Sequence, residues 1–162
     1  MRGSLRRVGP PPPSSADAEA RLKAQRTKDT GLERMLRSKL HRWGLRFRLH
    51  RPVPGTRRMG DLAFVRARVA VLVDGCFWHG CPDHGTWPKA NAQWWRTKIE
   101  ANRARDRSTN ELLAAAGWVV IRVWEHDLKT DPDQCAARIV QAVGRAHRLP
   151  PGVMHGKKDG SN

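Results

Sequence analysis

The sequence has few cysteines, few acidic residues and no long apolar run. The three cysteines are an odd number, and two of them lie near histidines, so a disulfide framework is not expected and a reducing cytoplasm is the predicted location. The longest apolar runs, 69–73 and 118–121, are too short to cross a bilayer, and the start of the chain does not resemble a signal peptide. We therefore expect no membrane association.

The positive charge is large and unevenly distributed. The chain has 31 Lys and Arg against 15 Asp and Glu, a formal net charge of +16. Residues 1–60 hold 16 of these basic residues and only 4 of the acidic ones. Such an excess serves solubility in some proteins, but clustered arginine more often marks a surface that binds phosphates. The charge therefore favours nucleic-acid binding, without naming a groove or a chemistry.

Composition divides the chain into one domain and two tails. Residues 1–20, which include a run of four prolines, are predicted to be a disordered tail, residues 21–148 a folded domain and residues 149–162 a flexible tail. Hydrophobic periodicity within the domain predicts a helix, three strands, a helix, a strand and a helix. The expected ranges are 30–44, 45–50, 61–65, 69–74, 91–116, 118–124 and 134–146. This order indicates an α/β (α+β) fold with a mixed central sheet flanked by helices.

Residues 74–84 concentrate thiols, imidazoles, carboxylates and two aromatic rings. Cys76, Cys81 and His84 could hold a zinc ion, which takes four such ligands tetrahedrally. His126, just past the predicted strand 118–124, is the preferred fourth ligand. Cys135 is the alternative, although it lies on the apolar face of a predicted helix, where a small buried side chain is the simpler interpretation. A zinc site closed by four protein ligands would be structural. The alternative is that these residues bind no metal and are two free thiols and two surface histidines.

Several motifs, taken in order, resemble those of the very short patch repair (Vsr) endonucleases. They are Lys28-Asp29-Thr30 with Glu33, Gly60-Asp61, Asp74 to His79, Asn102 with Arg105-Asp106, Gly117-Trp118, and Val123-Trp124-Glu125. The resemblance covers roughly residues 22–146. It implies the restriction-endonuclease-like PD-(D/E)XK fold with a structural zinc. It also implies a Mg²⁺-dependent enzyme that nicks double-stranded DNA on the 5′ side of the thymine in a T:G mismatch, a lesion left by deamination of 5-methylcytosine.

The resemblance assigns the catalytic magnesium to two positions. Asp61 matches the family's Mg²⁺-binding aspartate, and a carboxylate that opens a strand can hold such a hard cation. Val73 falls where the family uses a main-chain carbonyl as a second ligand. Without the family, Asp61 could equally be a turn residue. Asp74 could bind a second metal ion or merely end its strand.

Three further residues match the family's active site. His79 matches the catalytic histidine that helps to activate water, and a neutral imidazole can accept a proton near pH 7. Asp106 matches an acidic residue that could orient this ring; otherwise it would be a surface partner of Arg103 or Arg105. Glu33 matches a glutamate near the active site, although a first-turn acid is also favoured by the helix dipole.

The resemblance also assigns DNA contacts. Phe77, Trp78 and Trp95 match the aromatic residues that wedge into the duplex beside the mismatch, where unstacking costs least; Trp94 is expected in the core. Lys98, one helical turn beyond Trp95, fits a groove or phosphate contact; the alternative is an ordinary solvated lysine. The family's intercalating N-terminal methionine is replaced by Leu22, which could instead lie on a helix face. His126 stands where many relatives have cysteine.

Three functions are weighed for this chain. The first is the mismatch-specific nickase, a monomer associated with the nucleoid and linked to a cytosine-5 DNA methyltransferase and to downstream repair proteins. The second is a nuclease of the same fold without mismatch preference, acting in restriction or recombination. The third is a zinc-stabilised DNA-binding module without catalysis, which would need neither Asp61 nor His79.

Overall fold

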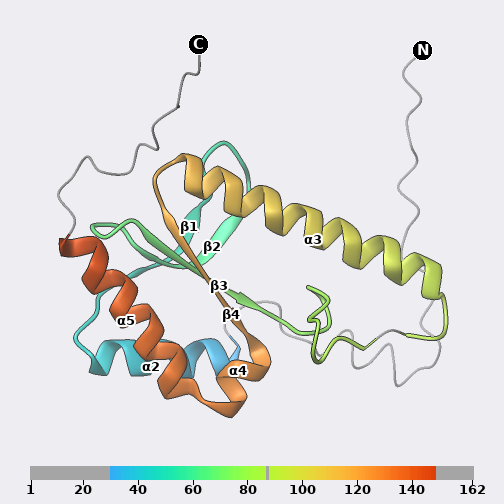
Figure 1. The fold of residues 1–162 in the computed structure, drawn as a ribbon, viewed down its shortest axis with the longest axis horizontal. Coiled ribbons are helices and arrows are strands. Elements are labelled where there is room, and N and C mark those ends of the chain that lie inside the picture. The colour runs from blue at the N-terminus through green and yellow to red at the C-terminus, as the bar shows by residue number, and fades with distance from the viewer. Residues whose placement is uncertain (1–29, 87, 149–162) are drawn as a thin grey trace, which may run out of the picture.

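The computed structural model describes residues 30–86 and 88–148, which form a four-stranded sheet with helices on both faces (Figure 1). The strands are β1 (Arg48–Pro52), β2 (Met59–Phe64), β3 (Val69–Asp74) and β4 (Val119–Trp124), in the order β1-β2-β3-β4. β1, β2 and β3 pair antiparallel, whereas β3 and β4 pair parallel. The predicted mixed sheet is confirmed.

Helices cover the two faces of the sheet unequally. They are α2 (Gly31–Arg42), α3 (Ala92–Ala115), α4 (Glu125–Thr130) and α5 (Pro132–Arg148). The main core lies between the sheet and the helices α2, α4 and α5, with Leu36, Leu128 and Ile139 fully buried in it. A smaller core lies on the α3 side, where Leu113 packs with Leu72. Among the described residues, no helix is both long and apolar enough to span a membrane.

β3 is buried on both faces, as its uninterrupted apolar run predicts. Val69 and Val71 pack in the main core, while Ala70 and Leu72 pack on the α3 side. This division follows from the alternation of side chains along a strand. β4 was also expected to be a buried strand, but all of its residues except Val123 are only half-buried. The reason is its place at the edge of the sheet.

The N-terminus of α2 agrees with the sequence. Thr30 caps the helix, because its hydroxyl accepts a hydrogen bond from the Glu33 backbone N–H at 3.2 Å. α3 ends just before Gly117, whose φ of +77° is the left-handed conformation that glycine adopts freely. The 66–68 segment forms the expected turn between β2 and β3.

Two elements differ from the sequence prediction. The strand expected at 45–50 begins at Arg48, because Leu45 and Phe47 pack against the main core from the segment before it. The strand also extends past its predicted end at residue 50 to Pro52, and an edge strand tolerates proline. The short helix α4, whose Leu128 is fully buried, was not predicted. The predicted tails, residues 1–20 and 149–162, and also Leu22, lie outside the described residues.

Candidate active site

The candidate site lies at the edge of the sheet where β3 and β4 both end. Asp74, the last residue of β3, is the register partner of Trp124, the last residue of β4. A loop follows β3, and α4 follows β4 directly. Because the two strands are parallel, this loop and the start of α4 come together although about 50 residues separate them in the sequence.

Asp61 lies where β2 and β3 separate. Their pairing begins at Leu62 with Val71, and the Asp61 carboxylate accepts a hydrogen bond from the Val73 backbone N–H at 2.8 Å. Burial raises the pKa of Asp61, the hydrogen bond from Val73 opposes this, and the charge of Glu33 raises the pKa further. A cavity of about 10 Å³ lies between these residues and His50. The predicted Asp61, Val73 and Glu33 therefore do come together around a space that suits one water molecule or ion.

His79 lies between two carboxylates. Its Nδ1 is 2.6 Å from Asp106 Oδ2 and 3.5 Å from Asp74 Oδ1. Burial alone would lower the pKa of His79, but the hydrogen bond to Asp106 and the charges of both carboxylates outweigh it and raise the pKa. With Nδ1 bound to Asp106, Nε2 is the ring atom able to exchange a proton with a substrate. The alternative partners of Asp106 are not observed, because Arg103 contacts Gly80 and Arg105 contacts Asn102.

Arg122 of β4 completes this cluster, and the sequence analysis did not identify it. Its Nη1 lies 2.7 Å from Asp74 Oδ2, and its Nη2 lies 3.1 Å from Asp106 Oδ1. The Nε atom donates to Asn110 Oδ1 at 3.1 Å. A sequence signal was present, because Arg122 is the only charged residue in the otherwise apolar strand 119–124. A long charged side chain in such a strand is expected to have a specific partner.

Four predicted zinc ligands come together beside this site. His126 Nδ1 lies 3.3 Å from Cys76 Sγ and 3.6 Å from Cys81 Sγ. The His84 and His126 rings are 4.3 Å apart between centroids. Tetrahedral zinc with sulfur and nitrogen ligands at about 2.0–2.3 Å places those ligands roughly 3.5 Å from one another. The distances from His126 to the two thiols are therefore of the size that a shared zinc ion requires, although Cys76 is not among the residues whose potential ligand atoms all lie within 4.8 Å of one another.

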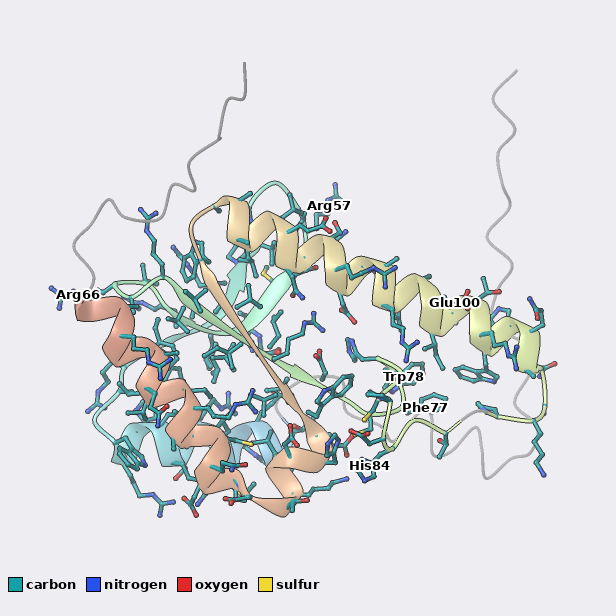
Figure 2. All side chains as sticks on the ribbon, viewed as in Figure 1. Arg57, Arg66, Phe77, Trp78, His84 and Glu100 are labelled. Atoms are coloured by element: carbon teal, nitrogen blue, oxygen red, sulfur yellow. The ribbon has the colours of Figure 1, made fainter. Side chains whose placement is uncertain are left out.

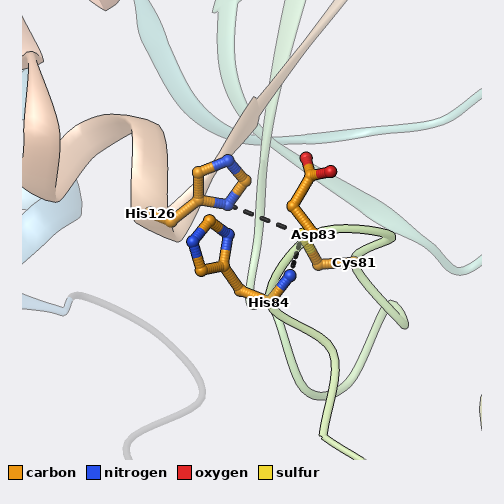
Figure 3. Close-up of side chains that lie close together, drawn as sticks. All are labelled: Cys81, Asp83, His84 and His126. Atoms are coloured by element: carbon orange, nitrogen blue, oxygen red, sulfur yellow. Dashed lines mark hydrogen bonds between the residues drawn. The ribbon is translucent and has the colours of Figure 1, made fainter.

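Asp83 joins this group, although it was not predicted as a ligand (Figure 3). One potential ligand atom from each of Cys81, Asp83, His84 and His126 lies within 4.8 Å of the others. Asp83 is exposed and precedes His84 directly, so its carboxylate is a further oxygen donor at the rim. Cys135 lies elsewhere, buried in the main core among the side chains of α5 and the sheet.

The loop between β3 and α3 is held against α3 by polar contacts. Asn102 donates to the Trp78 carbonyl at 2.9 Å, and Arg103 donates to the Gly80 carbonyl. Gly80 has a φ of +58°, and a Cβ there would lie 2.7 Å from Ile99 Cγ2 and 2.9 Å from Arg103 Nε. Only glycine allows α3 this close to the loop, which fixes the position of His79 next to it.

Three predicted DNA-contacting rings form a cluster on the same loop and the start of α3. Phe77 lies 5.1 Å from both Trp78 and Trp95 between ring centroids, and the three rings are half-buried. Trp94, expected in the core, is also half-buried and lies 4.8 Å from Trp95. Phe77, Trp78 and His84 are close together below α3, at the opposite end of the molecule from Arg66 (Figure 2). Lys98 is exposed on α3.

Sequence similarity to known proteins establishes the family of this chain. A family model described as "DNA mismatch endonuclease Vsr" matches residues 14–84. The DNA mismatch endonuclease Vsr of Escherichia coli strain K12 is 34% identical over 113 residues, which cover 67% of this chain and 69% of that protein. This chain belongs to the Vsr family of DNA endonucleases.

Other Vsr-like relatives are nicking enzymes by name. The type II nicking enzyme V.NaeI of Lentzea aerocolonigenes is 43% identical over 145 residues, covering 88% of this chain and 84% of the relative. The type II nicking enzyme V.XorIIP of Xanthomonas oryzae pv. oryzae is 48% identical over 105 residues, covering 64% of this chain and 75% of the relative. The Vsr-family resemblance is therefore confirmed, and the protein is a DNA endonuclease rather than a DNA-binding module without catalysis.

The environment of His79 makes a prediction that can be measured without DNA. The pKa of His79 should lie above the ordinary value of a histidine in the folded protein, and Asp106→Asn should lower it, because the variant removes the carboxylate that favours the imidazolium. The interaction stabilises the fold fully below the unfolded pKa, and this stability is lost as the pH rises through the folded pKa. Proton NMR titration of the His79 ring measures this pKa in the wild type and in the Asp106→Asn variant.

The control is Asp133→Asn, which removes a carboxylate at the start of α5, where it pairs with Lys39. This variant should leave the titration of His79 unchanged. A His79 pKa that is the same in the Asp106→Asn variant as in the wild type would show that Asp106 does not set it.

Proposed function

We propose that this Vsr-family endonuclease nicks double-stranded DNA on the 5′ side of the thymine in a T:G mismatch, in a reaction that depends on Mg²⁺. The observation that carries the proposal is the loop after β3. It presents the Phe77–Trp78 ring pair directly before His79, whose Nδ1 lies 2.6 Å from Asp106 Oδ2. Rings that can enter a duplex and an imidazole that can act as a base are thus held on one short segment.

Magnesium would be held by Asp61 together with the main-chain carbonyl of Val73. The fit rests on Asp61 itself, a half-buried carboxylate whose pKa is raised by desolvation and by the nearby charge of Glu33. Such a group gains from a cation that neutralises it. Bound there, the metal would polarise the scissile phosphate and offset the negative charge that develops on it. We also propose the PD-(D/E)XK fold, in which Asp61 would be the metal-binding acidic residue near the start of its strand.

His79 would be the general base. Its Nδ1 is fixed by Asp106, so Nε2 is directed to take the proton of the attacking water. The raised pKa means that the imidazole becomes neutral, and therefore able to act as a base, at a higher pH than an ordinary histidine does. Glu33, near Asp61, would help to order water at the phosphate.

The ring cluster would select the lesion. Inserting Phe77 and Trp78 between base pairs unstacks a step at a cost of a few kcal/mol, and this cost is least at a mispaired base. Trp95 supports both rings from α3. Lys98 would reach a phosphate or a groove edge, and Leu22 would take the place of an intercalating residue. The same loop would then both recognise the weakened stacking and place the imidazole.

Zinc would hold this loop in shape. We propose Cys76, Cys81, His84 and His126 as its four ligands, which tie the loop after β3 to the start of α4. Burial and the charge of the neighbouring Cys81 raise the pKa of the Cys76 thiol, and a bound zinc ion would reverse this by favouring the thiolate form. Four protein ligands leave no open position, and the role is therefore structural.

A second candidate differs only in the substrate. The relatives named type II nicking enzymes leave open a strand-specific nickase whose target is set by sequence rather than by a mismatch. In either case we propose a nucleoid-associated monomer that acts with a cytosine-5 DNA methyltransferase and with downstream repair proteins.

The substrate is tested with labelled duplexes that differ only in one T:G pair, incubated with the enzyme and Mg²⁺. We expect a single nick 5′ of the mismatched thymine. Asp61→Asn should abolish it, and His79→Ala should slow it by about 10²–10⁴-fold, the loss expected for a general base, while DNA binding persists in both variants. Asparagine at position 61 can still accept the Val73 hydrogen bond, so this variant removes the charge without removing the structural contact.

Asp133→Asn, on α5, is the matched control for a lost carboxylate and should nick normally. Equal nicking of the T:G and fully paired duplexes would favour the second candidate. Wild-type rates from either site variant would show that the catalytic residues lie elsewhere.

The wedge is tested with the double variant Phe77→Ala/Trp78→Ala. It should lose the preference for mismatched over paired duplex, because nothing remains to exploit the weaker stacking. Trp43→Ala is the control, since Trp43 is 59% exposed at the end of α2 and is not part of the ring cluster. The ratio of rates on the two duplexes is the measurement. A ratio unchanged in the double variant would mean that these rings do not read the lesion.

Metal analysis tests the zinc ligands. The purified protein should contain about one zinc per chain, and Cys76→Ala should lower both the zinc content and the melting temperature. Cys135→Ala is the matched control, because it removes a thiol from the core rather than from the cluster. Elemental mass spectrometry measures the content. Zinc retained by Cys76→Ala but lost from Cys135→Ala would contradict this ligand set.

A further inference from the structure

Arg122 is placed on the active-site face of the sheet by strand register. It is the partner of Leu72 across the β3–β4 pairing, and Leu72 packs on the α3 side. Asp74 lies two residues further along β3 and on the same face. The neighbours of Arg122 in β4, Ile121 and Val123, pack into the main core instead. Arg122 therefore projects toward α3 from the edge strand that ends at the site.

The guanidinium of Arg122 contacts three acceptors. Nη1 reaches Asp74, Nη2 reaches Asp106 and Nε reaches Asn110, at 2.7, 3.1 and 3.1 Å. These acceptors come from the end of β3 and from two positions along α3. A planar guanidinium with fixed donor directions can hold several acceptors in one arrangement, which a lysine cannot do. Arg122 thus connects α3 to the sheet next to His79.

Each of the two carboxylates contacts both Arg122 and His79. His79 contacts one oxygen of Asp106 and Arg122 contacts the other. Both oxygens are therefore held, which fixes the orientation of the carboxylate plane. Asp74 repeats the pattern, with Oδ1 toward His79 and Oδ2 toward Arg122. The four side chains form a closed ring in which the orientation of the imidazole depends on the guanidinium opposite.

The same contacts give Asp74 a role other than metal binding. Asp74 is buried, and its negative charge and that of the neighbouring Asp106 repel each other unless a cation lies between them. Arg122 supplies that cation, and its side chain is only 22% exposed. Removing one partner of such a buried pair leaves an uncompensated charge, so the cluster would rearrange rather than merely weaken.

We propose that Arg122 is a positioning residue of the nicking reaction, which holds Asp106 and Asp74 in the geometry that orients His79. The inference rests on the proposed role of His79 as general base. Arg122 makes no contact with substrate in this account; it acts on the rate through the orientation of the imidazole alone.

The test is a double-mutant cycle with single-turnover nicking of the preferred duplex. Arg122→Ala should lower the rate of nicking roughly 10- to 100-fold, the loss typical of residues that orient a site's ligands, with little change in DNA affinity. In a His79→Ala background the same substitution should cause no further loss, because its effect passes through the missing ring. A residue that only supported the fold would lower the rate in both backgrounds.

Arg122→Lys separates charge from geometry and guards against misfolding. It keeps a cation between the two carboxylates, so it should retain the wild-type melting temperature, yet it should lose rate because an ammonium cannot fix both carboxylate planes. Arg66→Ala, in the turn between β2 and β3, is the control for loss of a distant arginine. It should nick at the wild-type rate.

Three results would overturn the inference. They are a wild-type rate from Arg122→Ala, a wild-type rate from Arg122→Lys, and losses that simply add in the double variant. Each of them leaves the proposed role of His79 standing. A wild-type rate from His79→Ala alone would instead remove the general base, and with it the reason for positioning. The two failures are therefore told apart by the His79→Ala single variant.

Discussion

The parallel pairing of β3 with β4 is the constraint on which the site depends. It brings the end of β3 and the end of β4 to one edge of the sheet, with Asp74 beside Trp124. The loop after β3 supplies the thiols of Cys76 and Cys81 and the His79 imidazole, while β4 and the start of α4 supply Arg122 and His126. A shift of this register by one residue would turn Arg122 into the apolar core and separate His126 from the thiols.

Two independent clusters fix the loop that carries the rings and His79. On one side, thiols and imidazoles gather around His126 of α4. On the other, His79 is held by Asp106 of α3, and Asn102 and Arg103 bind the loop's carbonyls. Ordering a loop costs conformational entropy, and these contacts offset that cost before DNA is bound. A preorganised loop of this kind would suit the proposed reaction, in which one segment positions both a general base and the rings that enter the duplex.

The sequence predicted the parts of this molecule that depend on local pattern. The cap at Thr30, the turn at 66–68 and the two-sided burial of β3 follow from residue type and spacing alone, and the structure agrees. The start of β1 was misplaced, because alternation at Leu45 and Phe47 reflects packing against the core rather than strand pairing. The order of the family motifs identified Asp61, His79 and Asp106 as candidate active-site residues. Arg122 was missed: its charge in an apolar strand was a local signal that it has a partner, but the identity of its partners depends on the register of β3 and β4 and on the packing of α3, which no local pattern encodes.

The central claim is that a divalent cation bound at Asp61 lies next to the His79 imidazole. Paramagnetic relaxation by Mn²⁺, used in place of Mg²⁺ on zinc-loaded protein, measures this directly in the NMR signal of the His79 ring. The account predicts strong broadening of that signal in the wild type and its loss in Asp61→Asn, while any broadening from metal bound at other sites persists. A His79 signal that stays sharp with bound Mn²⁺, or that broadens equally in Asp61→Asn, would contradict the account.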